Sequence, residues 1–139
     1  MSDPSVRELP QPVAVDGWLR PQGYADAMTG RGRFIVTAGQ IGWEPSTQQF
    51  VSDDLVDQVR QTLTNVVTAV QAAGGEPTHV VRLTWYITDR DAYVTRRREI
   101  GAVYREIMGK HYPAMAVVIV AGLVESRARV EIEATAIVP

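Results

Sequence analysis

The stretch from Ala114 to Ala121 is apolar at every position, and this run constrains the fold more than any other feature of the sequence. It is far shorter than the roughly 20 residues that a helix needs to cross a bilayer. A strand without polar alternation is typical of a sheet position that is buried on both faces. The run therefore predicts a strand that needs cover above and below.

Helical periodicity is strongest in the segment that follows Ser52 and Asp53, either of which can cap a helix. Gly74-Gly75 ends this segment, and Pro77 prevents the helix from resuming. Six apolar side chains share one stripe of the predicted helix: Leu55, Val59, Leu63, Val66, Val67 and Val70.

A second helix is predicted after Asp89 or Asp91, and Gly109 is its stop signal. Its apolar side would consist of Tyr93, Ile100, Val103, Tyr104 and Ile107. Two helices can cover one face of a sheet, and the pattern offers no third helix for the other face. We therefore expect the open face to be covered by association with further copies of the chain.

Alternation of apolar and polar residues predicts further strands. The clearest cover residues 81–87 and 129–138, and weaker ones cover residues 24–28 and 33–38, whereas residues 43–49 are expected to form a loop. The proline-rich residues 1–20 are expected to form an irregular arm with one short edge strand. Residues 21–139 then form a single α+β domain with the order β-β-α-β-α-β-β.

Composition excludes several classes of function. The chain has no cysteine, which rules out disulfides, thiolate metal sites and cysteine nucleophiles. With only His79 and His111, no metal site is expected. A net charge of −2 favours neither nucleic acid nor an anionic membrane as a partner. The N-terminus lacks the pattern of a signal peptide, so we expect a cytoplasmic protein without a membrane segment.

Two charged patterns leave alternatives open. The run from Arg96 to Arg98 is either a solvated helix face or an anion site. Three successive helical positions point in different directions and cannot form one binding stripe, which favours the solvated face. Glu131 and Glu133 share one face of a strand, where paired carboxylates either catalyse proton transfer or are simply solvated. His111 is expected to have a capping or packing role.

Several segments, taken together, resemble one protein family. They are Val36-Thr37-Ala38-Gly39-Gln40-Ile41, the segment from Gln58 to Val66 followed by Gly74-Gly75, Pro113-Ala114 and residues 130–134. In this order they are similar to the RidA/YjgF family of enamine/imine deaminases, whose members have also been described as endoribonucleases. The resemblance extends from about Tyr24 to Val138.

The resemblance implies a chorismate-mutase-like fold, a homotrimer around a central barrel and substrate clefts between subunits. It implies hydrolysis of reactive imines to keto acids and ammonia without a cofactor. Glu131 would position the attacking water and Tyr24 would help to enclose the substrate. Ala38 and Gly39 would lie beside the substrate, and Tyr86 corresponds to an aromatic residue of the middle strand.

The chain departs from the family after Pro113-Ala114, where Met115 replaces the arginine that holds the substrate carboxylate by a bidentate contact. Val117 stands where members often have cysteine. These changes favour a neutral or bulkier substrate, unless Arg20 or Arg129 supplies the charge. The alternative is a trimer that binds a small molecule without catalysis. Ribonuclease activity has little support, because RNA binding normally rests on clustered basic charge.

Overall fold

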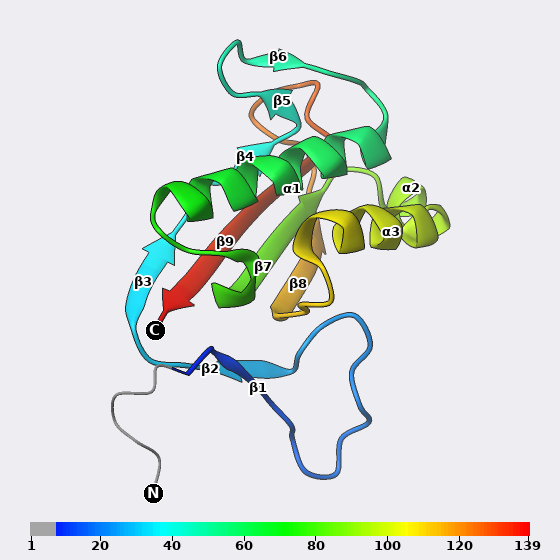
Figure 1. The fold of residues 1–139 in the computed structure, drawn as a ribbon. Coiled ribbons are helices and arrows are strands. Elements are labelled where there is room, and N and C mark those ends of the chain that lie inside the picture. The colour runs from blue at the N-terminus through cyan, green and yellow to red at the C-terminus, as the bar shows by residue number, and fades with distance from the viewer. Residues whose placement is uncertain (1–7) are drawn as a thin grey trace, which may run out of the picture.

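The structure is a computed structural model that describes residues 8–139, and Figure 1 shows its ribbon. Short strands precede the first helix, and longer strands and two further helices follow it. The elements in chain order are β1 (Gln11–Val13), β2 (Ala27–Thr29), β3 (Arg33–Val36), β4 (Gln40–Ile41), β5 (Trp43–Glu44), β6 (Gln49–Phe50), α1 (Leu55–Ala72), the 3₁₀ turn η1 (Pro77–His79), β7 (Val80–Ile87), α2 (Arg90–Thr95), α3 (Arg97–Met108), β8 (Ala114–Ile119) and β9 (Val130–Val138).

The main sheet has the order β3-β9-β7-β8, and β4 pairs with β9 beyond the end of β3. The β7–β8 pair is parallel and the other pairs are antiparallel, so the sheet is mixed. α1 and α3 lie on one face of the sheet, whose other face is open (Figure 1). The expected mixed α+β architecture is confirmed.

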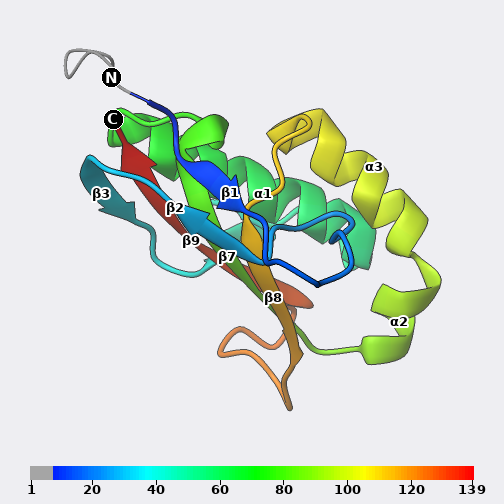
Figure 2. The ribbon, with the colours of Figure 1, turned by 90° about the horizontal axis from the view of Figure 1, so that it is seen from below.

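A small two-stranded sheet of β1 and β2 is separate from the main sheet and lies below it in Figure 1 and in front of it in Figure 2. β1 confirms the short strand expected in the N-terminal arm, whereas residues 1–7 of that arm lie outside the described residues. The strand expected at residues 24–28 is displaced to Ala27–Thr29, and only a single bridge joins Ala25 to Ala114 of β8.

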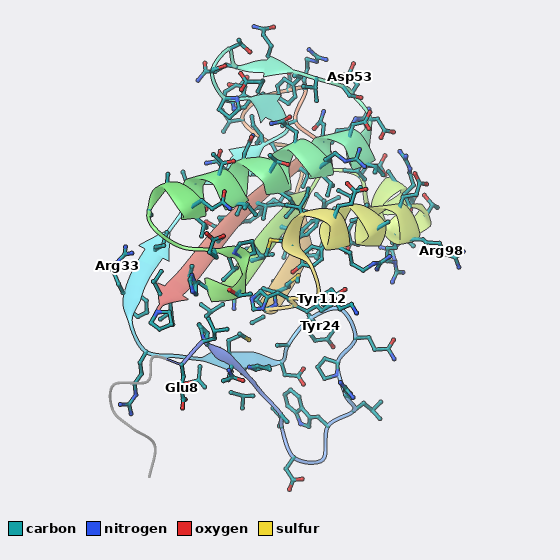
Figure 3. All side chains as sticks on the ribbon, in the orientation of Figure 1. Glu8, Tyr24, Arg33, Asp53, Arg98 and Tyr112 are labelled. Atoms are coloured by element: carbon teal, nitrogen blue, oxygen red, sulfur yellow. The ribbon has the colours of Figure 1, made fainter. Side chains whose placement is uncertain are left out.

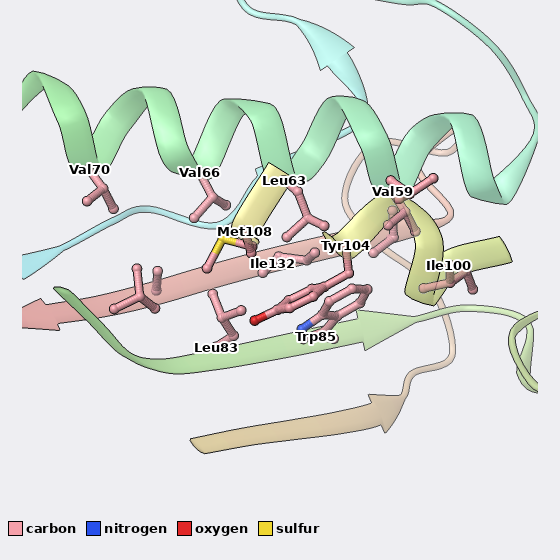
Figure 4. Packing of buried hydrophobic residues seen from close by; sticks show 14 of the residues in the cluster. Val59, Leu63, Val66, Val70, Leu83, Trp85, Ile100, Tyr104, Met108 and Ile132 are labelled. Carbon is pink, nitrogen blue, oxygen red and sulfur yellow. The ribbon is translucent and has the colours of Figure 1, made fainter. Parts of the chain in front are cut away.

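The core lies between the helices and the sheet (Figure 4). Val59, Leu63, Val66 and Val70 of α1 are fully buried, as the apolar stripe predicted, whereas Val67 is only partly buried. They pack over one face of β7 and β9, whose inward residues include Leu83, Trp85, Val130 and Ile132. A fully buried aliphatic side chain contributes about 1.5–3 kcal/mol, so this layer provides most of the stabilisation of the fold.

Two local predictions are corrected. The single helix expected before Gly109 is two helices, because Arg96 leaves the helical conformation with φ −110° and ψ 20°. No glycine or proline marks this break. The loop expected at residues 43–49 contains a hairpin, in which Trp43 of β5 lies opposite Phe50 of β6. Strands of two residues are too short to show alternation.

The prediction for β8 is also corrected. The sequence predicts a strand that is buried on both faces, whereas in the single chain β8 is an edge strand. Val117, Val118 and Ile119 are 38%, 39% and 47% exposed. Phe34 and Val36 are 70% and 75% exposed on β3. Within one chain these apolar side chains lack the cover that the sequence pattern requires.

The first helix is capped by Asp54 rather than by Ser52 or Asp53. The Asp54 carboxylate accepts a hydrogen bond from the backbone N–H of Asp57 (3.1 Å) and a second from the Arg96 guanidinium. The bond from Arg96 is the main reason that the pKa of Asp54 is lowered. Arg96 also pairs with Glu99 at 2.8 Å, so one arginine links the start of α1 to the α2–α3 junction.

Replacement of Asp54 separates its capping role from its charge. Asp54→Ala should lower the free energy of unfolding by about 0.5–2 kcal/mol at pH 7, whereas Asp54→Asn keeps a capping oxygen and should lose less. Because folding lowers the pKa of Asp54, its contribution is present above the unfolded value, about 3.9, and is lost as the pH falls through the folded value. Urea unfolding at pH 7 and pH 3 measures both effects. An alanine variant as stable as the parent at pH 7 would contradict the assignment.

Candidate functional site

Two carboxylates project from β9 onto the open face of the sheet. Glu131 and Glu133 alternate with the buried Val130, Ile132 and Ala134, and both are half-buried. Tyr86 of β7 lies opposite Glu131 in the register, and its hydroxyl donates a 2.5 Å hydrogen bond to Oε1 of Glu133. This bond is the main cause of the raised pKa of Tyr86. Glu133 is thus hydrogen-bonded to a phenol rather than simply solvated.

A β-bulge brings the chain over Glu131. β3 pairs as far as Val36 with Thr135, and β4 resumes with Gln40 opposite Ile132. The three residues between β3 and β4 oppose two residues of β9, and an extra residue of this kind bends the strand. Thr37 bridges the gap, because its backbone N–H donates to the Ala134 carbonyl and its hydroxyl accepts from the Ala134 N–H, both at 3.0 Å.

Gly39, at the end of this bulge, lies directly against Glu131. A Cβ atom added to Gly39 would lie 2.5 Å from Oε2 of Glu131, closer than such atoms approach. Only a residue without a side chain leaves the carboxylate in its observed place. Among residues 8–139, the Glu131 side chain forms no hydrogen bond or ion pair, so its oxygens are available to a ligand or water.

Gln58 of α1 fixes the segment that leads into β9. Its fully buried amide group donates to the carbonyls of Ser52 (2.9 Å) and Arg127 (3.0 Å) and accepts from the Arg129 N–H (2.8 Å). Gly42 packs against this side chain, where a Cβ would lie 2.7 Å from that of Gln58. Sequence reasoning missed this role, although a glutamine beside the apolar stripe of α1 is its signal.

The other predicted site residues lie on the opposite side of the sheet. Met115 and Val117 of β8 pair with Leu83 and Trp85, whose side chains face the helices. With Tyr24 they line a pocket of about 670 Å³ between α3 and β8. Figure 3 shows Tyr24 beside Tyr112, which lines the same pocket.

One chain therefore brings the predicted residues together in two groups rather than one. Gly39, Glu131 and Tyr86 lie on the open face, and Ala38 is exposed in the bulge next to Gly39. Tyr24, Met115 and Val117 lie on the helix side.

The basic residues considered in the sequence have separate positions. Neither Arg20 nor Arg129 lines the pocket, within the part of the chain that the structure describes, and Arg129 lines a smaller depression elsewhere. The arginine run divides: Arg96 is ion-paired, Arg97 lines the pocket, and Arg98 points away from the body (Figure 3).

The two histidines have local structural partners. Nε2 of His111 lies 2.7 Å from the Val80 carbonyl oxygen, and Nδ1 of His79 accepts from the Glu76 N–H at 2.9 Å. No group of three His, Cys, Asp or Glu side chains in residues 8–139 is placed to hold a metal ion. None of the helices in that range combines the length and apolar character that crossing a bilayer requires.

Comparison with known proteins places this chain in a family. The family model described as Endoribonuclease L-PSP matches residues 19–138. The chain therefore belongs to that family, which is the RidA/YjgF family that the sequence segments resemble. Human 2-iminobutanoate/2-iminopropanoate deaminase is 35% identical over 105 residues, which cover 76% of this chain and 73% of the human protein.

Solved structures agree with this assignment. The Rid-family protein YyfB of Yersinia pestis superposes with a TM-score of 0.83 at 26% identity, covering 94% of this chain and all of that one. Escherichia coli TdcF, whose crystal structure contains bound serine, has a TM-score of 0.67 at 32% identity, with 88% of this chain and 92% of that chain covered.

Substitution of Gly39 tests the geometry at Glu131. In Gly39→Ala the new methyl group should displace the flexible Glu131 carboxylate rather than the backbone, because the closest atoms are the end of that side chain. We expect little change in melting temperature and a crystal structure in which the carboxylate has rotated away. An unchanged carboxylate position would contradict the close approach.

Proposed function

We propose that this protein hydrolyses a reactive imine or enamine to a carbonyl compound and ammonia. The observation that carries the proposal is Glu131, a carboxylate without a hydrogen-bonding partner among residues 8–139, beside Gly39 on an open face. The similarity to proteins named 2-iminobutanoate/2-iminopropanoate deaminase supports this reaction.

The chemistry needs water and one group that transfers protons. Glu131 takes a proton from water as the oxygen attacks the carbon of the protonated imine, so the imine nitrogen becomes a neutral amine in the tetrahedral adduct. Glu131 then returns this proton to the nitrogen, the carbon–nitrogen bond breaks, and ammonia leaves as the hydroxyl group loses its proton to form the carbonyl. An enamine first gains a proton at carbon to give the imine. General acid–base assistance of this kind is worth about 10²–10⁴ in rate.

The complete site would lie between copies of the chain. Glu131 and the pocket beside Met115 are on opposite faces of one sheet, so a substrate in the pocket cannot reach the acid of the same chain. A second copy can bring its Glu131 to the pocket. A homotrimer with its open sheet faces packed at the centre agrees with the exposure of Phe34 and Val36.

The substrate would differ from those of the relatives named above. Met115 offers no charge to a carboxylate beside the reacting carbon, and with Val117 it makes that wall apolar. Small imino acids should therefore be poor substrates. The same observation favours the second candidate, a trimer that binds a small molecule and has lost catalysis.

Replacement of Glu131 distinguishes the two candidates. The imine generated in place from phenylalanine by an amino-acid oxidase should lose ammonia faster with the parent protein than in buffer, whereas the small imine from 2-aminobutyrate should gain little. Glu131→Gln should reduce that acceleration by about 10²–10⁴. The matched control is Glu133→Gln, which keeps an acceptor for Tyr86 and should retain most of the activity. No acceleration by the parent would favour the binding protein, and full turnover by Glu131→Gln would remove this acid from the mechanism.

Light scattering tests the assembly. We expect a stable particle of about three times the 15.3 kDa chain mass at micromolar concentration. Phe34→Lys should dissociate it, because several large apolar side chains at roughly 1.5–3 kcal/mol each would otherwise be buried around this position. Val124→Lys is the control, because Val124 is 99% exposed and lies outside the strands. A parent protein that remains a monomer would contradict the trimer.

A further inference from the structure

Two arginines and a glycine form one wall of the pocket beside Met115. Arg97, Gly101 and Arg105 follow one another at four-residue steps, which place them on one side of α3, and all three line the pocket. The backbone positions of the two arginines are about 12 Å apart along the helix. Nη1 of Arg105 lies 3.5 Å from where a Gly101 Cβ would be, so this guanidinium folds back towards Arg97.

The positive charge of this wall is not neutralised within the described chain. Neither Arg97 nor Arg105 forms an ion pair among residues 8–139, whereas the neighbouring Arg96 has two. No aspartate or glutamate is among the residues that line the pocket. Since unmatched donors favour an acceptor, the pocket suits an anion.

The pocket also has a large aromatic surface. The pocket is lined by four of the five tyrosines of the chain, together with Trp85. Tyr104 stacks on Tyr112 with ring centroids 5.3 Å apart, and Trp85 lies 6.4 Å from Tyr104. Burial raises the pKa values of Tyr93 and Tyr104, so both phenols stay neutral at pH 7. Such walls favour a planar ring by offset or edge-to-face contacts.

We propose that this pocket binds an aromatic carboxylate, with the carboxylate held by Arg97 and Arg105 over Gly101 and the ring against the tyrosines. This inference rests on the proposed function in one respect, because it makes the substrate the imine of an aromatic acid. The α3 arginines then supply the charge that Met115 lacks. These arginines supply the charge from α3 rather than from β8. A carboxylate held at this position suits an acid larger than the imines of small amino acids.

Binding can be measured without turnover. The probe is phenylpyruvate, the keto acid that hydrolysis of such an imine would release. Phenylacetone has the same skeleton without the carboxylate, and pyruvate lacks the ring. By calorimetry we expect phenylpyruvate to bind at least tenfold more tightly than either. Arg97→Gln and Arg105→Gln should each weaken it by roughly 10- to 100-fold, the range for a lost charge-assisted contact.

Two further variants control for charge and for space. Arg98→Gln removes the same charge from the same helix, outside the pocket, and should change the affinity less than twofold. Gly101→Leu keeps both arginines but fills the space between them, and it should weaken binding as much as the loss of one arginine. Light scattering of each variant should give the mass of the parent.

The outcomes separate this inference from the deaminase proposal. Equal affinities of phenylpyruvate and phenylacetone, or unchanged affinity in both arginine variants, would overturn the aromatic carboxylate site even if imines are hydrolysed. A change of particle mass in Arg97→Gln or Arg105→Gln would show that the arginine contacts another copy, and would also overturn it. Binding that follows the expected order would support the site even if Glu131→Gln shows no effect on any imine.

Discussion

The burial of one face of β9 beneath α1 determines where the functional groups of this protein lie. Val130, Ile132 and Ala136 are fully buried and Ala134 nearly so. Since successive residues of a strand point to opposite faces, the same packing directs Glu131, Glu133 and Thr135 to the open face. A register shift of one residue would place two carboxylates in the core, at a cost far greater than that of any surface substitution. The position of the acid therefore follows from the packing of the core.

Buried polar side chains of α1 extend this control to the loops around Glu131. Gln58 holds the segment before β9 by two hydrogen bonds and contacts the Ser52 carbonyl by a third. Asn65 donates to the carbonyls of Ile41 (3.0 Å) and Trp43 (2.9 Å). A buried amide group is tolerated when its hydrogen bonds are formed. These bonds then hold the loops that the amide contacts in one conformation. α1 thus supports both the chain that leads into β9 and the chain that follows the Gly39 bulge.

The elements predicted from the sequence are those whose pattern is long enough to repeat. α1, β7 and β9 show several periods of apolar alternation, and their packing confirms it. The two-residue strands β5 and β6 show none. At the break between α2 and α3, Arg96 pairs with Asp54, which is 42 residues away and which no local pattern reveals. The aromatic pocket was missed for a related reason. Tyr93 and Tyr104 suit the apolar side of a helix equally well, and only tertiary structure brings them to Trp85 and Tyr112.

The carboxylates of the candidate site and the arginines of the pocket lie on opposite sides of the sheet. The open face carries Glu131 and Glu133 beside Arg82, whereas the pocket behind it carries Arg97 and Arg105 without an acid. A carboxylate ligand is attracted to the second side and repelled by the first, so it should bind with its negative end towards α3. If a neighbouring copy supplies the acid, the reacting carbon then points away from α3 and towards that copy. The same separation keeps the base and the anion anchor of one chain from neutralising each other. Close pairing would lower the basicity of the carboxylate and occupy the guanidinium groups. The proposed division of the site between two copies would therefore have a chemical advantage besides covering the open sheet face.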